Sequence, residues 1–236
     1  MAIDPLDQEK CLSMARVRGW QIMQLLNAHE HSDHIGGNAA VVAATGAKVI
    51  AHHKAGSRIS GVDRGAKAGD VIKVGKMVEL ECSDMPGHTL CHICPFAHTD
   101  QPALFSGDTL FDAGAGNTHN GGDTGSLYNT FAQQLARLPE NTRLYPGQDY
   151  IESNLKFTLS REPDNSAAQA LLPAVSAHDP AVSVVTTLRQ EKQHNTFFRL
   201  NNGTIIAKLR ERFPELPDKP DAKAVFSALR TLRNEW

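Results

Sequence analysis

The sequence predicts an α/β fold with a mostly α-helical C-terminal region. Apolar segments of strand length alternate with segments of helical periodicity in the first part of the chain. Four apolar strands each end in a bend and a polar side chain, an arrangement that places functional groups at one edge of a sheet. Beyond Arg161 the composition changes, and prolines separate a series of helical segments.

The N-terminal part alternates between strand and helix. A strand is expected to end at residues 3–5, and a helix with an apolar face follows at residues 7–18. A strand at residues 20–26 precedes a short buried helix at residues 38–45, which is rich in alanine and valine. Another strand is expected at residues 48–51. This alternation is typical of an α/β protein.

The rest of the chain contains shorter strands and then helices. Residues 70–82 hold turn signals and read as short strands. Helices are expected at residues 124–137, 150–160, 167–177, 205–212 and 222–233. We therefore expect a first domain at residues 1–160 and a mostly helical second domain at residues 161–236.

The bulk composition excludes several classes of protein. The chain has 236 residues, a net charge of −2 and 21% charged residues, so no nucleic-acid partner is expected. No apolar run is long enough to span a bilayer, and the N-terminus does not read as a signal peptide. Four cysteines are too few for a disulfide framework in a chain of this length, so the reducing cytoplasm is the expected location.

One loop concentrates metal-ligand chemistry. His29, His31, Asp33 and His34 form the pattern H-x-H-x-D-H directly after an apolar strand. Imidazole suits zinc, iron and other first-row metals, and a carboxylate adds a harder ligand. A tight loop can direct the first two histidines to one metal ion and the last two residues to a second. We prefer this interpretation to a polar loop whose histidines face solvent.

Three later strands end in the same way as the first. The strand at residues 80–82 leads to His88, the strand at residues 103–105 leads to Asp108, and the strand at residues 143–145 leads to Gln148. A glycine in each bend permits the tight turn that places the polar side chain at the edge of the sheet. The four strand ends together predict one shared site.

The order of these motifs resembles that of the metallo-β-lactamase-fold hydrolases. The H-x-H-x-D-H loop, the lone histidine after Pro-Gly and the Gly-Asp-Thr-Leu-Phe motif carry this resemblance. The region around His88, together with residues 149–157 and 195–199, is similar to glyoxalase II, the hydroxyacylglutathione hydrolase. The resemblance implies a four-layer αβ/βα sandwich followed by a helical substrate-binding domain.

The resemblance also implies a ligand set for two metal ions. His29, His31 and His88 would hold metal 1. Metal 2 would be held by Asp33, His34 and Asp108, of which Asp108 bridges the two ions. We expect one or two zinc ions, with iron or manganese as alternatives.

The sequence departs from the family pattern in three places. Gln148 stands where the family has its last histidine ligand, and an amide oxygen binds zinc less well than imidazole, so metal 2 should be weakened. The family's usual glutathione contacts fall near Asn117 and His119 here. The N-terminal strand expected before Ile3 is absent, which indicates either a start that has been lost or trimmed or a bare sheet edge that favours association.

The implied reaction is hydrolysis of a thioester, S-2-hydroxyacylglutathione, to glutathione and a 2-hydroxy acid. A water shared by two metals loses a proton near neutral pH, and its hydroxide attacks the thioester carbonyl. Asp33 and Asp108 are the expected catalytic carboxylates, with Asp33 orienting the water. The expected substrate contacts are Tyr150, Asn117, His119, Lys156 and Arg199. A monomer and a dimer both remain open.

Other functions remain open from the sequence. A mononuclear Fe(II) persulfide dioxygenase would use His29, His88 and Asp108, and it tolerates the loss of a histidine at position 148. The segment at residues 121–128 resembles that branch. A β-lactamase-like or lactone hydrolase, or a member that binds a metabolite without turnover, is also compatible with the motifs. The long helical C-terminus favours the thioester hydrolase.

Two further features are given structural interpretations. Cys91 and Cys94 have C-x-x-C spacing without a second pair, which favours a packed strand with free thiols over a metal or redox site. His52 and His53 follow a strand and are expected to be surface residues.

Overall fold

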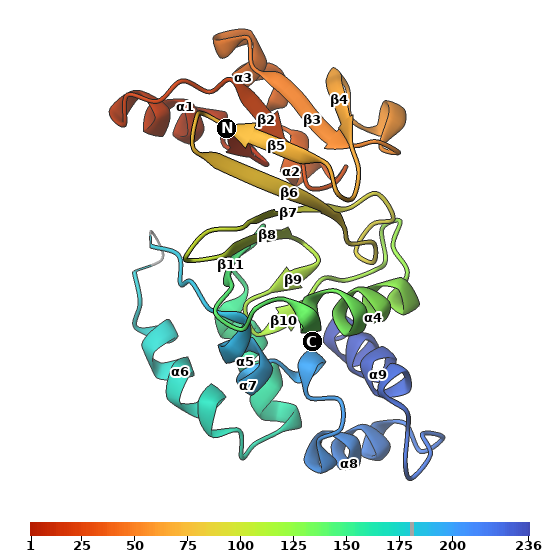
Figure 1. The fold of residues 1–236 in the computed structure, drawn as a ribbon. Helices are drawn as coiled ribbons and strands as arrows, with labels where there is room; N and C mark the ends of the chain where they lie inside the picture. The colour runs from red at the N-terminus through yellow and green to blue at the C-terminus, as the bar shows by residue number, and fades with distance from the viewer. Residues whose placement is uncertain (180–181) are drawn as a thin grey trace.

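Two β-sheets pack face to face at the centre of the molecule, and helices cover the outer face of each (Figure 1). The computed structural model describes residues 1–179 and 182–236. This arrangement agrees with the αβ/βα sandwich that the motif order implied. No helix in the described ranges combines the length and the apolar character that crossing a membrane requires.

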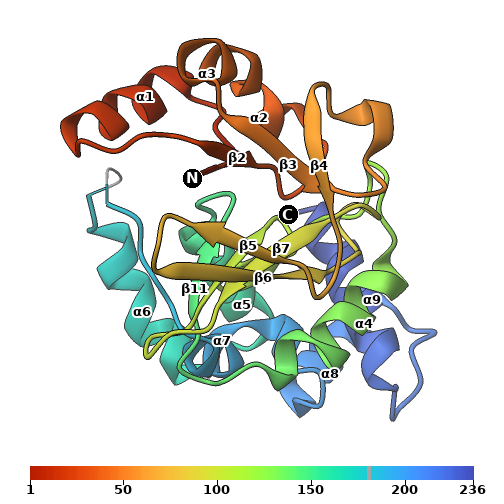
Figure 2. The same ribbon diagram turned by 45° about the horizontal axis from the view of Figure 1, so that its top comes forward.

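The first sheet contains four parallel strands in the order β1-β2-β3-β4. They are β1 (Ala2–Ile3), β2 (Gln24–Leu26), β3 (Lys48–His52) and β4 (Val62–Ala66). The helices α1 (Gln8–Val17) and α3 (Asn38–Thr45) cover its outer face, as Figure 2 shows, and the short α2 (Ser32–Ile35) follows β2. Both predicted helices form, but α3 is not buried throughout, because its alanines at positions 39, 40, 43 and 44 are exposed. The predicted strand at residues 20–26 forms only over its last three residues.

The second sheet is mixed and has the order β11-β8-β7-β6-β5. Its strands are β5 (Val71–Val74), β6 (Val78–Asp84), β7 (Ile93–Ala97), β8 (Ala103–Gly107) and β11 (Arg143–Pro146). Neighbours from β5 to β8 are antiparallel, whereas β11 joins β8 in parallel. A small ribbon of β9 (Leu110–Phe111) and β10 (Gly114–Ala115) lies next to it in the chain.

The space between the sheets is filled by aliphatic side chains. Leu26 and Ile50 from the first sheet pack with Ile72, Leu80 and Ile93 from the second sheet. All five are at least 96% buried. Since burial of such side chains is the main stabilising contribution in a sheet sandwich, this layer fixes how the two sheets meet.

Six longer helices cover the outer face of the second sheet: α4 (Thr124–Gln133), α5 (Ile151–Arg161), α6 (Ser166–Ser176), α7 (Leu188–His194), α8 (Gly203–Arg212) and α9 (Ala222–Asn234). The five helices predicted there are confirmed, and α7 was not predicted. Short 3₁₀ turns lie at Gly56–Arg58, Leu135–Arg137 and Thr196–Phe198. Phe131 of α4, Phe157 of α5 and Phe226 of α9 belong to one hydrophobic cluster with Leu104 of β8. The C-terminal helices therefore share their core with the second sheet.

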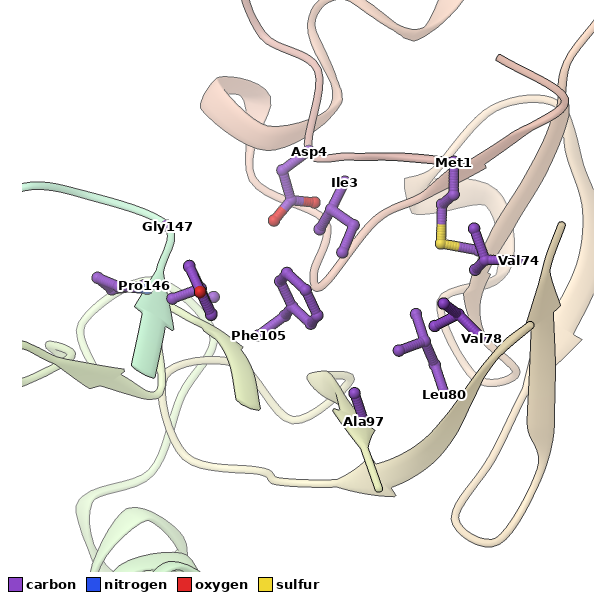
Figure 3. A pocket seen from close by; sticks show the side chains of 12 residues that line it. Met1, Ile3, Asp4, Val74, Val78, Leu80, Ala97, Phe105, Pro146 and Gly147 are labelled. Atoms are coloured by element: carbon purple, nitrogen blue, oxygen red, sulfur yellow. The ribbon is translucent and has the colours of Figure 1, made fainter. Parts of the chain in front are cut away.

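A pocket of about 490 Å³ lies beside β1, which is the edge strand of the first sheet (Figure 3). Its lining is mostly apolar and comes from both sheets, with Ile3 on one side and Leu80 and Phe105 on the other. Asp4 and Gly147 form its polar end. The predicted metal ligands do not line this pocket, so it is not the site of the expected chemistry.

Candidate metal centre

The H-x-H-x-D-H loop is held rigidly between β2 and α3. The Asn27 amide donates to the carbonyl of His34 at 3.1 Å, and the Asn38 amide donates back to Asn27 Oδ1 at 2.7 Å. A Cβ at Gly37 would lie 1.7 Å from the carbonyl oxygen of Pro5, so glycine permits the loop to pack against the segment after β1. Buried contacts thus hold the backbone of the loop that carries the histidines.

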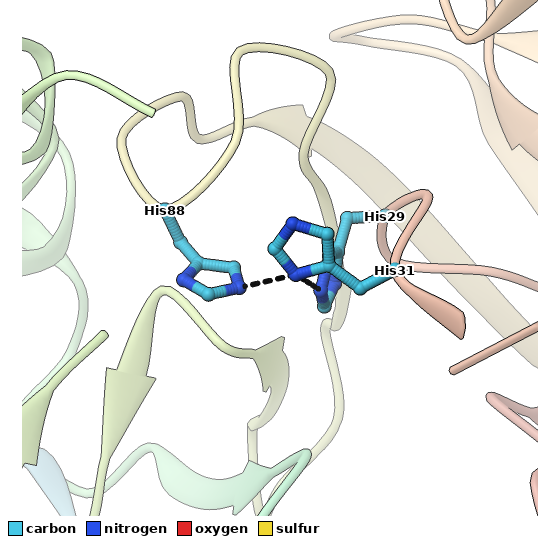
Figure 4. Close-up of side chains that lie close together, drawn as sticks. All are labelled: His29, His31 and His88. Atoms are coloured by element: carbon cyan, nitrogen blue, oxygen red, sulfur yellow. Dashed lines mark hydrogen bonds between the residues drawn. The ribbon is translucent and has the colours of Figure 1, made fainter. Parts of the chain in front are cut away.

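The ring nitrogens of three histidines converge on one point (Figure 4). His31 Nδ1 lies 3.0 Å from His29 Nε2 and 3.0 Å from His88 Nε2. His29 and His88 are buried, whereas His31 is partly exposed. Tetrahedral zinc holds nitrogen ligands at about 2.0–2.1 Å, so three nitrogens this close together suit a single ion.

Backbone carbonyls determine the tautomers of two of these rings. His88 Nδ1 lies 2.7 Å from the carbonyl oxygen of Asn117, and His31 Nε2 lies 2.9 Å from that of Asn120. A carbonyl only accepts, so each of these nitrogens carries the proton. His31 Nδ1 and His88 Nε2 therefore face each other with lone pairs. Two lone pairs at this distance repel unless a cation lies between them, so the residues fit a metal ion.

A second group of ligand atoms lies beside the first. His34 Nε2 is 3.2 Å from Asp108 Oδ1 and 3.8 Å from Asp33 Oδ2. The other oxygen of Asp108 lies 3.6 Å from His88 Nε2, so this carboxylate spans the two groups. His34 Nε2 and Asp108 Oδ1 are buried atoms without a hydrogen-bond partner in the described structure. A cation between them would supply the missing partner.

The charges around the second group favour a cation. His34 Nδ1 lies 2.9 Å from Asp4 Oδ2, and the other oxygen of this buried carboxylate accepts the Ala28 N–H. Burial lowers the pKa of His34, but the facing carboxylates of Asp108 and Asp4 outweigh it and raise this pKa to about 10. In the first group, burial and the neighbouring His92 lower the pKa of His29, which keeps its ring neutral.

Gln148 closes the exposed side of the second group. Its Nε2 donates to Asp33 Oδ2 at 2.9 Å. Gly147 brings the chain close, because a Cβ there would lie 2.4 Å from Asp108 Oδ1 and 2.7 Å from His34 Cε1. The strand end after β11 therefore reaches the centre as predicted, but it presents an amide that hydrogen-bonds a carboxylate.

Three predicted substrate contacts share a pocket of about 320 Å³ next to the first group. Asn117, His119 and Tyr150 line it together with Arg230 and Arg233 of α9, which the sequence analysis missed. Arg230 is buried and donates to the carbonyls at positions 115 and 116, whereas Arg233 donates to Asn154. Two arginines spaced i, i+3 on one helix face were the available signal.

The other two predicted substrate contacts lie away from this pocket. Lys156 Nζ is 2.7 Å from Glu152 Oε1 on an exposed part of α5. Arg199 donates from Nε to Glu162 at 2.7 Å, and Glu162 also accepts from Asn202. Both cations are engaged in local ion pairs, so the structure does not bring them to the site.

His52 is buried, and the prediction that it is a surface residue is wrong. Its Nδ1 accepts the N–H of Lys54, so Nε2 carries the proton and faces Asp84 Oδ1 at 3.4 Å. Although ligand atoms of His52, His53 and Asp84 lie within 4.8 Å of one another, the lone pair of His52 Nδ1 is engaged by the Lys54 N–H, so His52 in this tautomer offers no free ligand atom to a metal. The prediction of free thiols at Cys91 and Cys94 is confirmed.

Comparisons with known proteins agree with this geometry. The model of the metallo-beta-lactamase superfamily matches residues 3–148, and the hydroxyacylglutathione hydrolase C-terminus model matches residues 149–236. The hydroxyacylglutathione hydrolase of a Polaromonas species is 72% identical, with all of this chain and 90% of the relative covered. The enzyme of the same name from Nitrosococcus oceani is 59% identical with the same coverage.

Solved structures extend the likeness to the fold. ETHE1 from Myxococcus xanthus has a TM-score of 0.63 at 25% identity, with 97% of this chain and 86% of that chain covered. The BLEG-1 B3 metallo-beta-lactamase has a TM-score of 0.61 at 23% identity, with 83% and 86% covered. At this identity the second likeness supports the sandwich architecture alone.

Proposed function

This chain belongs to the metallo-β-lactamase superfamily and, within it, to the hydroxyacylglutathione hydrolases, and we propose that it hydrolyses the thioester of an S-2-hydroxyacylglutathione. The products are glutathione and a 2-hydroxy acid. The observation that carries the proposal is the 72% identity to a hydroxyacylglutathione hydrolase over the whole chain. The four free cysteines support a reducing cytoplasm as its location.

The donor set supports zinc as the resident metal. His29 Nε2, His31 Nδ1 and His88 Nε2 would hold the first ion. Asp33, His34 and Asp108 would hold a second, with Gln148 as a weak fourth ligand. When bound, zinc supplies Lewis acidity that lowers the pKa of water and polarises the thioester carbonyl.

The carboxylates orient the attacking water. The side chain of Asp33 is 49% exposed and receives the Gln148 amide on Oδ2, which leaves Oδ1 free to accept a proton from water. Asp108 is buried and fixes the distance between the two groups of ligands. A thiol pKa of about 8.5 makes the thiolate a good leaving group, so the site needs no strong general acid.

The glutathione part is placed in the pocket next to His88. Asn117, His119 and Tyr150 offer polar contacts there, and Arg233 adds a cation for a carboxylate of the tripeptide. Arg230 supports this wall from behind, because its guanidinium holds the carbonyls before Asn117. Lys156 and Arg199 already have carboxylate partners, so we assign the charge contact to Arg233.

The comparisons favour the hydrolase over the Fe(II) persulfide dioxygenase that the sequence left open. The hydroxyacylglutathione hydrolase C-terminus model covers all of residues 149–236. His31 also favours it, because its ring nitrogen joins His29 and His88 in one group, whereas the dioxygenase triad would leave it unused.

The test measures metal per chain by elemental analysis, S-lactoylglutathione hydrolysis, and O₂ consumption with glutathione persulfide. We expect at least one zinc per chain and thioester hydrolysis without O₂ uptake. One iron per chain with O₂ uptake and no hydrolysis would overturn the proposal. A fully metallated protein with neither activity would also overturn it.

A further inference from the structure

A fourth histidine, His92, lies directly behind the metal centre. It precedes β7 and is fully buried. Its ring stacks on that of His29, with ring centroids 5.0 Å apart and an interplanar angle of 16°. It also meets the ring of His88 edge to face at 6.3 Å. His92 therefore packs against two of the three rings of the first ligand group without reaching the point on which they converge.

The same ring binds the backbone of the bridging carboxylate. The N–H of Asp108 donates to His92 Nε2 at 3.2 Å. His92 Nε2 must therefore hold a lone pair, and the proton lies on Nδ1, which is 3.5 Å from Cys94 Sγ. The ring is a neutral acceptor with one tautomer.

The surrounding chain keeps His92 in place independently of any ligand. The Met85 N–H donates to the carbonyl of His92 at 3.0 Å, and the next N–H, of Ile93, donates to Ala28 at 2.8 Å. Gly107 has a φ of +48°, and a Cβ there would lie 2.8 Å from His92 Nε2. Glycine thus permits the Asp108 loop to approach the ring closely.

We propose that His92 is a positioning residue, which holds the Asp108 carboxylate and the His29 ring where both ligand groups require them. The bond to the Asp108 N–H fixes the start of the loop whose carboxylate lies between His34 and His88. The stacked ring limits rotation of His29, whose Nδ1 has no hydrogen-bond partner in the described structure. Outer partners of metal ligands tune affinity in this way. The inference rests on the proposed metal function.

Two substitutions with side chains of similar length distinguish the effect of the hydrogen-bond acceptor of His92 from the effect of its size. In His92→Gln the amide oxygen can accept the Asp108 N–H, whereas His92→Met has no such acceptor. Zinc affinity of the metal-free proteins is measured by competition with a chromophoric chelator, beside the melting temperature of each metal-free form. We expect His92→Met to bind zinc about tenfold or more weakly than wild type, and His92→Gln to recover most of that loss.

The difference in zinc affinity between His92→Met and His92→Gln is the decisive measurement, because a general loss of packing would lower the affinity of both variants alike. Ile72→Val, in the buried layer between the sheets, should lower the melting temperature without changing zinc affinity. If His92→Met does not fold, His92→Asn replaces it, because its amide is too short to reach the Asp108 N–H. Equal zinc affinities for the acceptor and non-acceptor variants, or wild-type affinity in both, would overturn the inference. Wild-type protein that binds no zinc would overturn the metal site itself.

Discussion

The two halves of the metal centre are built in different ways. In the first half, His31 and His88 each donate to a backbone carbonyl in the loop at residues 117–120. In the second half, His34 is held by a side-chain carboxylate, Asp4, and the group opens to solvent through Asp33. Backbone contacts therefore orient His31 and His88 of the first half before metal binds. The second half instead depends on the charge of Asp4, and its last expected ligand position is occupied by the amide of Gln148.

The largest expected effect comes from removing a ligand of the first half. His31→Ala leaves two rings where three converge, so kcat/KM should fall by more than about 100-fold, since loss of an outer partner alone costs 10- to 100-fold. Thioester hydrolysis and zinc per chain measure this. His98→Ala, an exposed histidine paired with Glu81, is the matched control. Near-normal turnover in His31→Ala would break the assignment of the first half.

Asp4→Asn tests the second half separately. The substitution keeps the shape and the φ of +47°, which asparagine tolerates, but removes the charge that faces His34 Nδ1. We expect the affinity of the second zinc to fall by about 10- to 100-fold, with the first site nearly unchanged. A stepwise zinc titration separates the two events. Weakening of both sites to the same degree would show that the halves are not independent.

Gln148→His should make the zinc affinity of the second half more similar to that of the first. An imidazole at this position replaces the amide that now donates to Asp33. Because imidazole is the better zinc ligand, the second-site occupancy should rise and the rate should increase by up to about tenfold. Elemental analysis and steady-state kinetics test it together. No gain in either quantity would refute the weak-ligand role of Gln148.

The proposed substrate pocket lies next to the first half, but none of the expected metal ligands lines it. A substitution in this pocket should therefore change substrate binding without changing metal binding. Arg233→Ala removes the proposed carboxylate contact and should raise KM by about tenfold with little change in kcat. The same kinetics on Lys156→Ala compare the two assignments. A larger rise in KM for Lys156→Ala than for Arg233→Ala would favour the contact predicted from sequence.

The smallest effect concerns Asp112, which follows Asp108, the carboxylate between the two halves, in the same stretch of chain. Burial and the nearby Glu191 raise the pKa of Asp112 to about 7, and Thr186 donates to its Oδ1. A raised carboxyl pKa contributes stability below about pH 4, and that stability is lost as the pH rises through 7. Asp112→Asn should therefore melt about 2–4 °C higher than wild type at pH 8. The difference in melting temperature between Asp112→Asn and wild type should be smaller at pH 5.5. An equal difference at both pH values would contradict the raised pKa of Asp112.

Local patterns predicted most of the centre. The spacing H-x-H-x-D-H and the glycine bends before His88 and Asp108 are short-range features, because a strand end and a turn fix where the side chain lies. The departure at Gln148 was also visible as one residue in a recognisable strand end. These predictions needed no knowledge of how distant segments pack.

Distant contacts could not be predicted in this way. The carbonyls of Asn117 and Asn120 determine the tautomers of His88 and His31. Every residue has a backbone carbonyl, so the sequence does not indicate which carbonyls make such contacts. Arg233 reaches the site from a helix near the C-terminus, and packing alone brings it there. The strand β4 (Val62–Ala66) was missed because its polar and glycine residues do not alternate, since only its last residue is buried.

The most direct test of the difference between the halves is a zinc titration of the metal-free wild-type protein, with chelator competition to cover both affinities. We expect two binding events, the first at least about tenfold tighter than the second. Repeating the titration with Asp4→Asn should weaken only the second event. Two events of equal affinity, or a single event that Asp4→Asn weakens, would contradict the account.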